Sequence, residues 1–381
     1  MEGGGFAHYV RSGQSLLRCG YTTGTCAALA AAGAVRLLLT GKAPEALSLT
    51  TPKGLEVAVP PAGAELLEPG RRARCAVRKD AGDDYDVTDG MLIWAEATRS
   101  PRPGVRIDGG EGVGRVTKPG LDQPVGAAAI NRVPRRMIEE QVQAVCAQLG
   151  CADGMEVIVS IPGGEERAAR TFNPVLGVEG GLSILGTSGI VEPMSEQAIV
   201  DTIALQMGQA AVSSTDLILT PGNYGEDFLK STGLDGLGVP VVKYSNFLGD
   251  ALDIAAGSGF RRVLVAGHIG KLVKAAGGIM NTHSRYADCR TELFCAHAAL
   301  CGANVELCRK LMGAATTDAC LELLDGAGLR EPVLDSLLAA IQLHLERRAA
   351  GAYAVGAVIF SNVYGPLGRT GKANEILEGW K

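Results

Sequence analysis

Three loops in the second half of the chain carry polar residues directly after apolar, strand-like runs. Residues 221–225 (PGNYG), 244–247 (YSNF) and 267–271 (GHIGK) each begin where such a run ends. Ligands bind at the carboxyl ends of the strands in open α/β sheets, so we expect the three loops to line one pocket. Its predicted binding residues are Gly222, Asn223, Gly225, Ser245, Asn246 and Gly267.

The most reactive side chains of these loops are His268 and Lys271, which follow the run RVLVA at residues 262–266. Histidine titrates near neutral pH and can therefore accept or donate a proton. A lone histidine is more often a structural hydrogen-bonding group, but its place after a strand favours a functional role. We predict that both residues are catalytic and act by electrostatics or hydrogen bonding, with His268 the better candidate for accepting a proton.

Three threonines stand at the start of an alanine-rich, helix-like segment in the first half. They are Thr22, Thr23 and Thr25 within the sequence GYTTGTCAA. A threonine hydroxyl can cap a helix, and the free N–H groups at a helix N-terminus also hold anions because the helix dipole is positive there. One cap does not need three hydroxyls. We predict that these threonines bind a carboxylate or another anion, with capping alone as the alternative.

Two further loops of the first half combine charge with glycine. Residues 79–90 (KDAGDDYDVTDG) hold five aspartates, a density that could ligate Mg²⁺ or Ca²⁺, although the EF-hand spacing is missing. A solvated acidic loop is the competing interpretation, and substrate hydrogen bonding by Lys79, Asp83 and Asp84 is the functional one. Residues 109–120 (GGEGVGRVTKPG) fit neither a P-loop nor a dinucleotide fingerprint. They predict a glycine-rich hairpin that lines a cleft, with Lys118 placed to bind an anion.

The elements that must position these residues differ between the two halves. The first half reads as short strands between two helices, which favours a two-layer α+β domain. Its predicted helices cover residues 26–39 and 131–149, and its strands cover 47–51, 55–59, 74–78, 91–98, 105–108 and 155–161.

The second half alternates apolar, β-branched runs with helical patterns, which is typical of a parallel, Rossmann-like α/β sheet. Its predicted strands cover residues 216–220, 239–244, 262–266 and 352–360, and its helical regions cover 195–209, 248–256 and 291–348. We place the boundary near the glycine-rich residues 185–195, which gives domains 1–190 and 191–381.

The overall composition narrows the class of protein. Of the 381 residues 46% are hydrophobic and 20% are charged, a balance that predicts a folded chain. The net charge of −5 argues against general nucleic-acid binding, which needs a basic surface. The ten cysteines include no C-x-x-C pair, the start lacks a signal-like apolar stretch, and the apolar run 26–35 is shorter than the ~20 residues of a membrane span. We expect a cytoplasmic protein with reduced thiols and neither membrane nor nucleic acid as partner.

Seven motifs of the chain, taken in order, are similar to those of a known family. They are GYTTGTCAA, KDAGDDYDVTDG, GEGVGRVTKPGL with AINRVPRRMI, GTSGIVEPMSE, PGNYG, SNFLGDAL and GHIGKLVKAAGGIMNTHSRYADCR. Together they resemble the cobalt-precorrin-5B C1-methyltransferase family of anaerobic cobalamin biosynthesis, from about residue 18 to residue 365. Residues 43–69 and 301–345 carry no motif of this kind.

The resemblance implies methyl transfer from S-adenosylmethionine to C1 of a cobalt-bearing contracted tetrapyrrole, giving cobalt-precorrin-6A and S-adenosylhomocysteine. It also implies an α+β domain followed by a Rossmann-like domain. Cobalt arrives inside the corrinoid substrate, so no metal site on the protein is expected. The acetate and propionate arms of the macrocycle need hydrogen-bond donors, for which the candidates are Thr22, Thr23, Thr25, Lys79, Lys118, Arg135 and Arg136.

The macrocycle is itself the carbon nucleophile, so alignment of the two reactants carries much of the catalysis. We expect S-adenosylmethionine at the three loops of the second half, and an active site between the two domains, because a large flat substrate needs a wide cleft. Hand-off to neighbouring pathway enzymes is a further expectation, and the oligomeric state is left open.

Two alternatives come from other classes of protein. One is a nicotinamide-dependent oxidoreductase built on the second half, although PGNYG lacks the glycine fingerprint expected at the first βα turn. The other is a non-catalytic corrinoid-binding protein, which a turnover assay separates from an enzyme.

Overall fold

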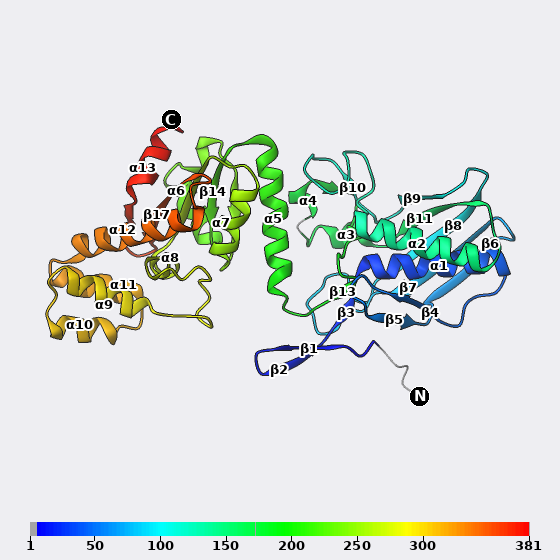
Figure 1. Ribbon diagram of the computed structural model, residues 1–381, viewed down its shortest axis with the longest axis horizontal. Helices are drawn as coiled ribbons and strands as arrows, with labels where there is room; N and C mark the ends of the chain where they lie inside the picture. The colour runs from blue at the N-terminus through cyan, green and yellow to red at the C-terminus, as the bar shows by residue number, and fades with distance from the viewer. Residues whose placement is uncertain (1–5, 172, 381) are drawn as a thin grey trace. The chain divides into compact units, whose positions relative to one another are not determined.

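The computed structural model describes residues 6–171 and 173–380 of the chain (Figure 1). Contacts within the chain divide it into two compact units, Met1–Ser195 and Glu196–Lys381. The boundary predicted from the sequence lies after residue 190. Both units contain helices and strands, with parallel as well as antiparallel strand pairs, so the protein belongs to the mixed α/β class.

A five-stranded sheet forms the frame of the first unit. Its strands lie in the order β6 (Gly63–Glu68), β7 (Arg72–Arg78), β8 (Leu92–Ser100), β11 (Gly154–Ser160) and β9 (Val105–Gly109). Neighbouring strands are antiparallel except β9 and β11, which run parallel. Buried residues alternate with more exposed ones along β8, as in a strand with one face on the core. Helix α1 (Thr23–Thr40) packs on the sheet, and α2 (Arg132–Gln148) packs on α1.

Short strand pairs connect this frame to its loops. The pairs are β1 (Tyr9–Ser12) with β2 (Ser15–Arg18), β4 (Leu47–Thr50) with β5 (Glu56–Val59), β10 (Arg115–Val116) with β12 (Val178–Glu179), and β3 (Gly20–Tyr21) with β13 (Ile190–Val191). Two short helices, α3 (Gly164–Ala168) and α4 (Asn173–Leu176), precede β12. Because β13 pairs with β3, the end of the first unit returns to the strand that leads into α1.

Helix α1 lies in the core of the first unit. Thr22 caps it by accepting a hydrogen bond from the backbone N–H of Thr25 at 3.2 Å, and Gly41 ends it with a left-handed φ of 71°. Helix α1 is long and apolar enough to cross a membrane, but the core helices of folded proteins also meet these two criteria, and 83% of α1 is buried inside the unit. The apolar segment is longer than the run 26–35 considered in the sequence, because the helix continues past Arg36, its single charged residue.

The second unit is built on a five-stranded sheet of different topology. Its order is β15 (Val241–Lys243), β14 (Asp216–Thr220), β16 (Arg262–His268), β17 (Ala354–Ser361) and β18 (Gly365–Arg369). The first four strands are parallel, and β18 runs antiparallel to β17. The carboxyl ends of β14, β15 and β16 therefore lie at one edge of the sheet.

Helices cover both faces of this sheet. Leu217 and Leu219 of β14 belong to one apolar core, with α5 (Glu196–Ser213), α7 (Leu248–Gly257) and α12 (Arg330–Ala349). Ile218 of the same strand belongs to a second core, with α6 (Asn223–Ser231) and α13 (Gly371–Glu378). Burial on both faces explains why these strands read as continuous apolar runs.

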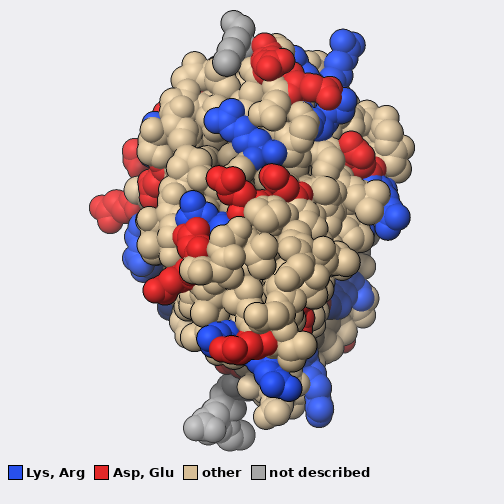
Figure 2. Space-filling view, turned by 90° about the vertical axis from the view of Figure 1, so that its left-hand side faces the viewer, with Lys and Arg blue, Asp and Glu red and all other residues tan. Residues whose placement is uncertain are grey.

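Four separate helices form the helical region predicted over residues 291–348. They are α9 (Arg290–Leu300), α10 (Val305–Met312), α11 (Thr317–Gly326) and α12, after the short α8 (Ile269–Leu272) and a 3₁₀ turn. The side chains of Asn304 and Thr316 cap α10 and α11, which is why new helices begin there. Figure 2 shows the side of the molecule on which α9–α11 lie, and there basic and acidic side chains are interspersed on an uncharged background.

Candidate functional site

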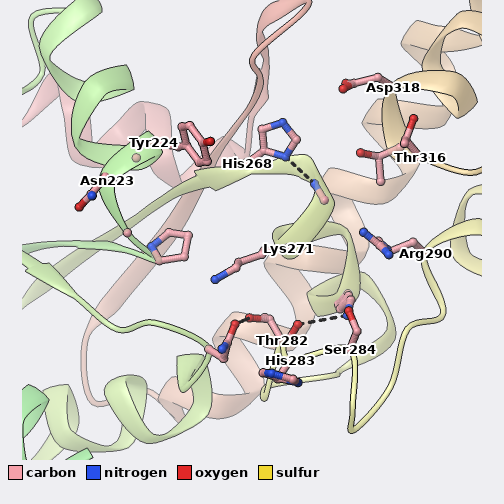
Figure 3. A pocket seen from close by; sticks show the side chains of 17 residues that line it. Asn223, Tyr224, His268, Lys271, Thr282, His283, Ser284, Arg290, Thr316 and Asp318 are labelled. Carbon is pink, nitrogen blue, oxygen red and sulfur yellow. Dashed lines mark hydrogen bonds between the residues drawn. The ribbon is translucent and has the colours of Figure 1, made fainter. Parts of the chain in front are cut away.

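A pocket of about 630 Å³ lies at the carboxyl ends of β14 and β16 in the second unit (Figure 3). Its volume is within the range of small-molecule sites. The strand-end loops contribute Pro221, Gly222, Asn223, Tyr224, Gly225, Asn246, His268, Gly270 and Lys271. Later segments contribute Lys274, Thr282, His283, Ser284, Arg290, Thr316, Thr317 and Asp318.

Most of the residues predicted for the three loops line this pocket, but Ser245 and Gly267 stand behind its wall. The Ser245 carbonyl accepts a hydrogen bond from Lys271 Nζ at 3.2 Å. Gly267 is packed so tightly that an added Cβ would come within 3.0 Å of Leu272. Both residues therefore support the lining and do not form it.

Close packing at the start of α6 explains the glycine at residue 225. A Cβ at this position would lie 1.5 Å from Thr220 Oγ1 at the end of β14. Thr220 is fully buried, and its hydroxyl has no hydrogen-bond partner among the described residues. Because Gly225 sits against the strand end, the first turn of α6 approaches the sheet and leaves Asn223 and Tyr224 exposed at the pocket.

His268 ends β16 and caps the short helix that follows. Its Nδ1 accepts a hydrogen bond from the backbone N–H of Gly270 at 3.0 Å, so the proton of the neutral ring lies on Nε2. Burial lowers the pKa of His268, and the opposing effect of the Asp318 carboxylate is weaker. His268 therefore faces the pocket as a neutral hydrogen-bond donor, and accepting a proton at Nδ1 would break the cap.

Two lysines with different surroundings follow His268. Lys274 is almost fully buried and donates hydrogen bonds to the carbonyls of Thr282 at 3.1 Å and Ala287 at 2.8 Å. Lys271 is only half-buried, and its one hydrogen bond to a described residue goes to the Ser245 carbonyl. Burial lowers the pKa of both side chains, and the charge of Lys274 adds to the effect on Lys271.

The loop over residues 280–290 is held in place by Lys274. The two carbonyls that Lys274 binds lie on either side of His283 and Ser284, which line the pocket. Arg290, at the start of α9, also lines the pocket, but Asp288 accepts hydrogen bonds from two of its nitrogens. The positive charge of Arg290 is thus largely neutralised within the loop.

Sequence reasoning missed one wall of the pocket, formed by Thr316, Thr317 and Asp318. Figure 3 shows Asp318 and Arg290 on one side of the pocket and Asn223 and Tyr224 on the other, with His268 and Lys271 between them. Asp318 Oδ1 accepts a hydrogen bond from Ser361 Oγ at 2.6 Å, which fixes its carboxylate. The sequence TTD at residues 316–318 is typical of a helix N-cap. It could have indicated that a new helix begins there, inside the segment predicted as one long helical region.

In the first unit the three threonine hydroxyls already have protein partners. Thr22 caps α1, and Thr25 Oγ1 donates to the Gly189 carbonyl at 2.7 Å. Thr23 Oγ1 accepts a hydrogen bond from Leu185 N–H at 3.0 Å. All three residues are buried. Their role in binding an anion stays a prediction, and the structure accounts for each hydroxyl by a bond within the unit.

The acidic loop over residues 79–90 is also tied to its own unit. The side chain of Lys79 is buried, with 2% of the residue exposed, and its Nζ forms an ion pair with Asp86 Oδ2 at 3.0 Å. Asp83 accepts a hydrogen bond from the backbone N–H of Arg18 at 2.7 Å. Asp84 accepts one from Met194 N–H at 3.3 Å. Burial would raise the pKa of Asp86, but Lys79 and the hydrogen bonds from Thr88 lower it overall. No group of three potential metal ligands (His, Cys, Asp or Glu) occurs among the residues that the structure describes.

The remaining predicted substrate donors lie in different environments of the first unit. Arg135 is half-buried and donates to the carbonyls of Ile130 and Ile107 at 2.8 and 2.9 Å. Arg136 is exposed, with Glu140 3.8 Å away. The side chain of Lys118 packs against Gly177, where an added Cβ would come within 2.5 Å of it. None of these residues lines the pocket of the second unit.

Comparison with known proteins agrees with the resemblance seen in the motifs. The sequence model of the CbiD family matches residues 10–193, and that of the CbiD C-terminal domain matches residues 281–371. A solved structure, a cobalamin biosynthesis protein from Archaeoglobus fulgidus, is 27% identical, with a TM-score of 0.39 over 74% of this chain and 87% of that chain.

Several curated relatives cover nearly the whole chain, and all three named here are called cobalt-precorrin-5B C(1)-methyltransferase. The protein from Ruminiclostridium cellulolyticum is 46% identical over 93% of this chain and 91% of its own length. The relative from Alkaliphilus metalliredigens is 40% identical over 97% of both chains. The relative from Moorella thermoacetica is 41% identical over 96% of this chain and 98% of its own. The chain therefore belongs to the CbiD family of cobalt-precorrin-5B C(1)-methyltransferases.

Proposed function

We propose that this protein transfers a methyl group from S-adenosylmethionine to C1 of cobalt-precorrin-5B, giving cobalt-precorrin-6A, in cobalamin biosynthesis. The observation that carries the proposal is the 46% identity to a curated cobalt-precorrin-5B C(1)-methyltransferase over 93% of the chain. The corrinoid brings its own cobalt and its own nucleophilic carbon. The chain therefore has to bind and orient two reactants, and the donors and charges that line the pocket suit this task.

We assign the methyl donor to the pocket of the second unit, which we classify as Rossmann-like. Four parallel strands with helices on both faces support this classification, and the pocket at their carboxyl ends is where such sheets bind ligands. We classify the first unit as a two-layer α+β domain, which is supported by the packing of α1 on its sheet and of α2 on α1. Gly222, Asn223, Gly225 and Asn246 would contact the donor.

S-adenosylmethionine supplies an electrophilic methyl group when it is bound. His268 is placed to donate a hydrogen bond from Nε2, and Lys271 supplies a positive charge inside the pocket. We assign both residues a role in hydrogen bonding and electrostatics, the role expected from the sequence. The arms of the corrinoid need further donors, and the candidates retained from the first unit are Thr22, Thr23, Thr25, Lys79, Lys118, Arg135 and Arg136. Asp83 and Asp84 are retained as candidate acceptors for amide or protonated groups of the substrate.

A mass-spectrometric assay tests the proposed reaction. The purified protein is incubated with cobalt-precorrin-5B and S-adenosylmethionine that carries a deuterated methyl group, and the corrinoid is then analysed. We expect the mass of one labelled methyl group to be added at C1, and none when the donor is omitted. Binding of the corrinoid without any gain in mass would refute the proposal and favour a non-catalytic binding protein.

The assay is repeated with two variants that separate the pocket from the surface. Asn223→Ala removes an exposed amide from the pocket wall, whereas Lys310→Met removes an exposed charge on α10 that is paired with Glu306. We expect slower methylation with the first variant and an unchanged rate with the second.

A further inference from the structure

Lys271 is a cation in the pocket that forms no ion pair with any residue in the described parts of the chain. By contrast, Arg290 is paired with Asp288, and Lys274 is bound to carbonyls of the loop over residues 280–290 and lies 3.9 Å from Asp288. A half-buried ammonium group with one carbonyl partner has hydrogen-bonding capacity left, because it carries three N–H donors. Charged groups in such surroundings are normally paired.

A second donor stands beside the same peptide group. Asn246, the residue after Ser245, lines the pocket, and its Oδ1 accepts a hydrogen bond from Thr282 Oγ1 at 3.3 Å. Because Oδ1 is occupied by that bond, Nδ2 is the amide atom that is still available to donate. It forms no hydrogen bond to a described residue. The lysine ammonium is thus bound to the carbonyl of Ser245, the asparagine NH₂ group belongs to the next residue, and both side chains line the same pocket.

The backbone at this point adopts a conformation that needs support. Ser245 has a φ of 55°, in the left-handed region that non-glycine residues seldom occupy. Its carbonyl receives the Lys271 bond, and Asn246 is fixed to Thr282 through both its side chain and its carbonyl, the latter at 2.9 Å from Thr282 N. Conformations of this kind persist where the surroundings hold them, and they occur at ligand sites.

We propose that Lys271 and Asn246 form a carboxylate-binding site in the pocket of the second unit. A carboxylate offers two acceptor oxygens to the ammonium and amide donors and supplies the missing negative charge. This inference rests on the proposed function, which provides two sources of such a group. One is the amino-acid carboxylate of S-adenosylmethionine, and the other is an acetate or propionate arm of the corrinoid.

Two variants remove the site in different ways. Lys271→Met deletes the charge and keeps most of the side-chain length. Asn246→Asp keeps the Oδ1 that accepts from Thr282 and replaces the NH₂ donor by a negative oxygen, so it tests the site without removing the bond that holds the loop. Lys310→Met on α10 is the matched control for loss of one lysine charge at the surface. Thermal unfolding of each variant verifies that it is folded.

Calorimetric binding of four probes identifies the carboxylate. S-adenosylhomocysteine carries the amino-acid group, whereas 5′-methylthioadenosine has the same nucleoside without it. Cobyrinic acid has free carboxylate arms, whereas its heptamethyl ester has none. For the probe whose carboxylate the site holds, we expect Kd to rise about 10- to 100-fold in both pocket variants, with its neutral counterpart and the Lys310→Met control unchanged.

The outcomes are distinct. Weaker binding of S-adenosylhomocysteine alone supports the donor carboxylate as the ligand, and weaker binding of cobyrinic acid alone supports a substrate arm. Equal losses for a probe and its neutral counterpart, or no loss for any probe, would overturn the carboxylate site. Methylation by the wild-type protein is measured separately: an active enzyme with unchanged variant affinities refutes only this inference, and a carboxylate effect in an inactive protein refutes only the proposed function.

Discussion

The start of α1 in the first unit and the pocket of the second unit contain the same kinds of groups in different states. Each combines hydroxyls or amides with a lysine near the start of a helix that follows a strand. In the first unit the hydroxyls of Thr22, Thr23 and Thr25 are bonded within the unit, and Lys79 is paired with Asp86. In the pocket Lys271 forms no ion pair with any described residue. Among the described residues, a charge that lacks a counter-ion, more than residue type, distinguishes the pocket from the start of α1.

The largest effect predicted by this comparison is on stability. Lys79→Met should lower the free energy of unfolding by about 3 kcal/mol, because Asp86 would keep its charge in a mostly buried place without its partner. Lys271→Met should change it by less than about 1 kcal/mol, since a single hydrogen bond to a carbonyl is lost. Urea unfolding followed by circular dichroism measures both. Equal losses for the two variants would remove the distinction between the clusters.

A second contrast concerns two glycines of the second unit. Gly225→Ala should destabilise the protein by about 2 kcal/mol and weaken S-adenosylhomocysteine binding, because the new methyl group collides with the buried Thr220 and displaces the start of α6, which lines the pocket. Gly208→Ala, in the middle of α5 with nothing within 4 Å of the added Cβ, should stabilise the protein by up to about 1 kcal/mol. Thermal unfolding and calorimetry of both variants test this, and a tolerated Gly225→Ala would contradict the packing described at the start of α6.

A third contrast lies at the helix start itself. Thr23→Val should lower the free energy of unfolding by about 1 kcal/mol, because the N–H of Leu185 loses its acceptor, the hydroxyl of a buried threonine. The same variant should leave S-adenosylhomocysteine affinity unchanged, since Thr23 is not part of the pocket. Measured affinity for cobyrinic acid then decides the anion-binding role predicted from the sequence: a loss would support it, and no loss would return Thr23 to a structural role.

The smallest predicted effect concerns pH. The pKa of His268 is lowered in the folded protein, so between that value and the ordinary histidine pKa of about 6.5 the unfolded chain binds more protons. Folding stability should therefore fall as pH drops below about 6.5. His268→Gln should flatten this dependence, because glutamine can accept from Gly270 and donate to the pocket without titrating.

Turnover of the same variant tests the donor role of His268. We expect His268→Gln to lower kcat by less than the ~10²–10⁴-fold typical for loss of a general base. A larger loss, together with the disappearance of a pH–rate limb below about 6.5, would show that His268 accepts a proton during the reaction.

Four of the five strands in the sheet of the second unit were predicted from their apolar runs, whereas the more exposed edge strand β18 was missed. Runs such as DLILT and RVLVA leave little choice of structure, and polar residues directly after them are found at the strand ends. The loops that line the pocket followed from this rule, including Asn223, Asn246 and His268.

What could not be predicted depends on contacts between distant segments. Lys274 follows a short helical signal and reads as a surface residue, yet the carbonyls of residues 282 and 287 bury it. Asp318 lies in a stretch without any recognised motif, and only the fold brings it beside Ser361 at the end of β17. At α1 the density of threonines predicted an anion-binding site. The sequence could not show that Gly189 accepts a hydrogen bond from Thr25 and that Leu185 donates one to Thr23, because these partners lie more than 150 positions later in the chain.

A crystal structure of the protein with S-adenosylhomocysteine tests the central claim most directly. The account predicts that the ligand occupies the pocket of about 630 Å³ in the second unit, in contact with the loops that carry Asn223, Asn246 and His268. Full occupancy of a site in the first unit, away from all three loops, would contradict it.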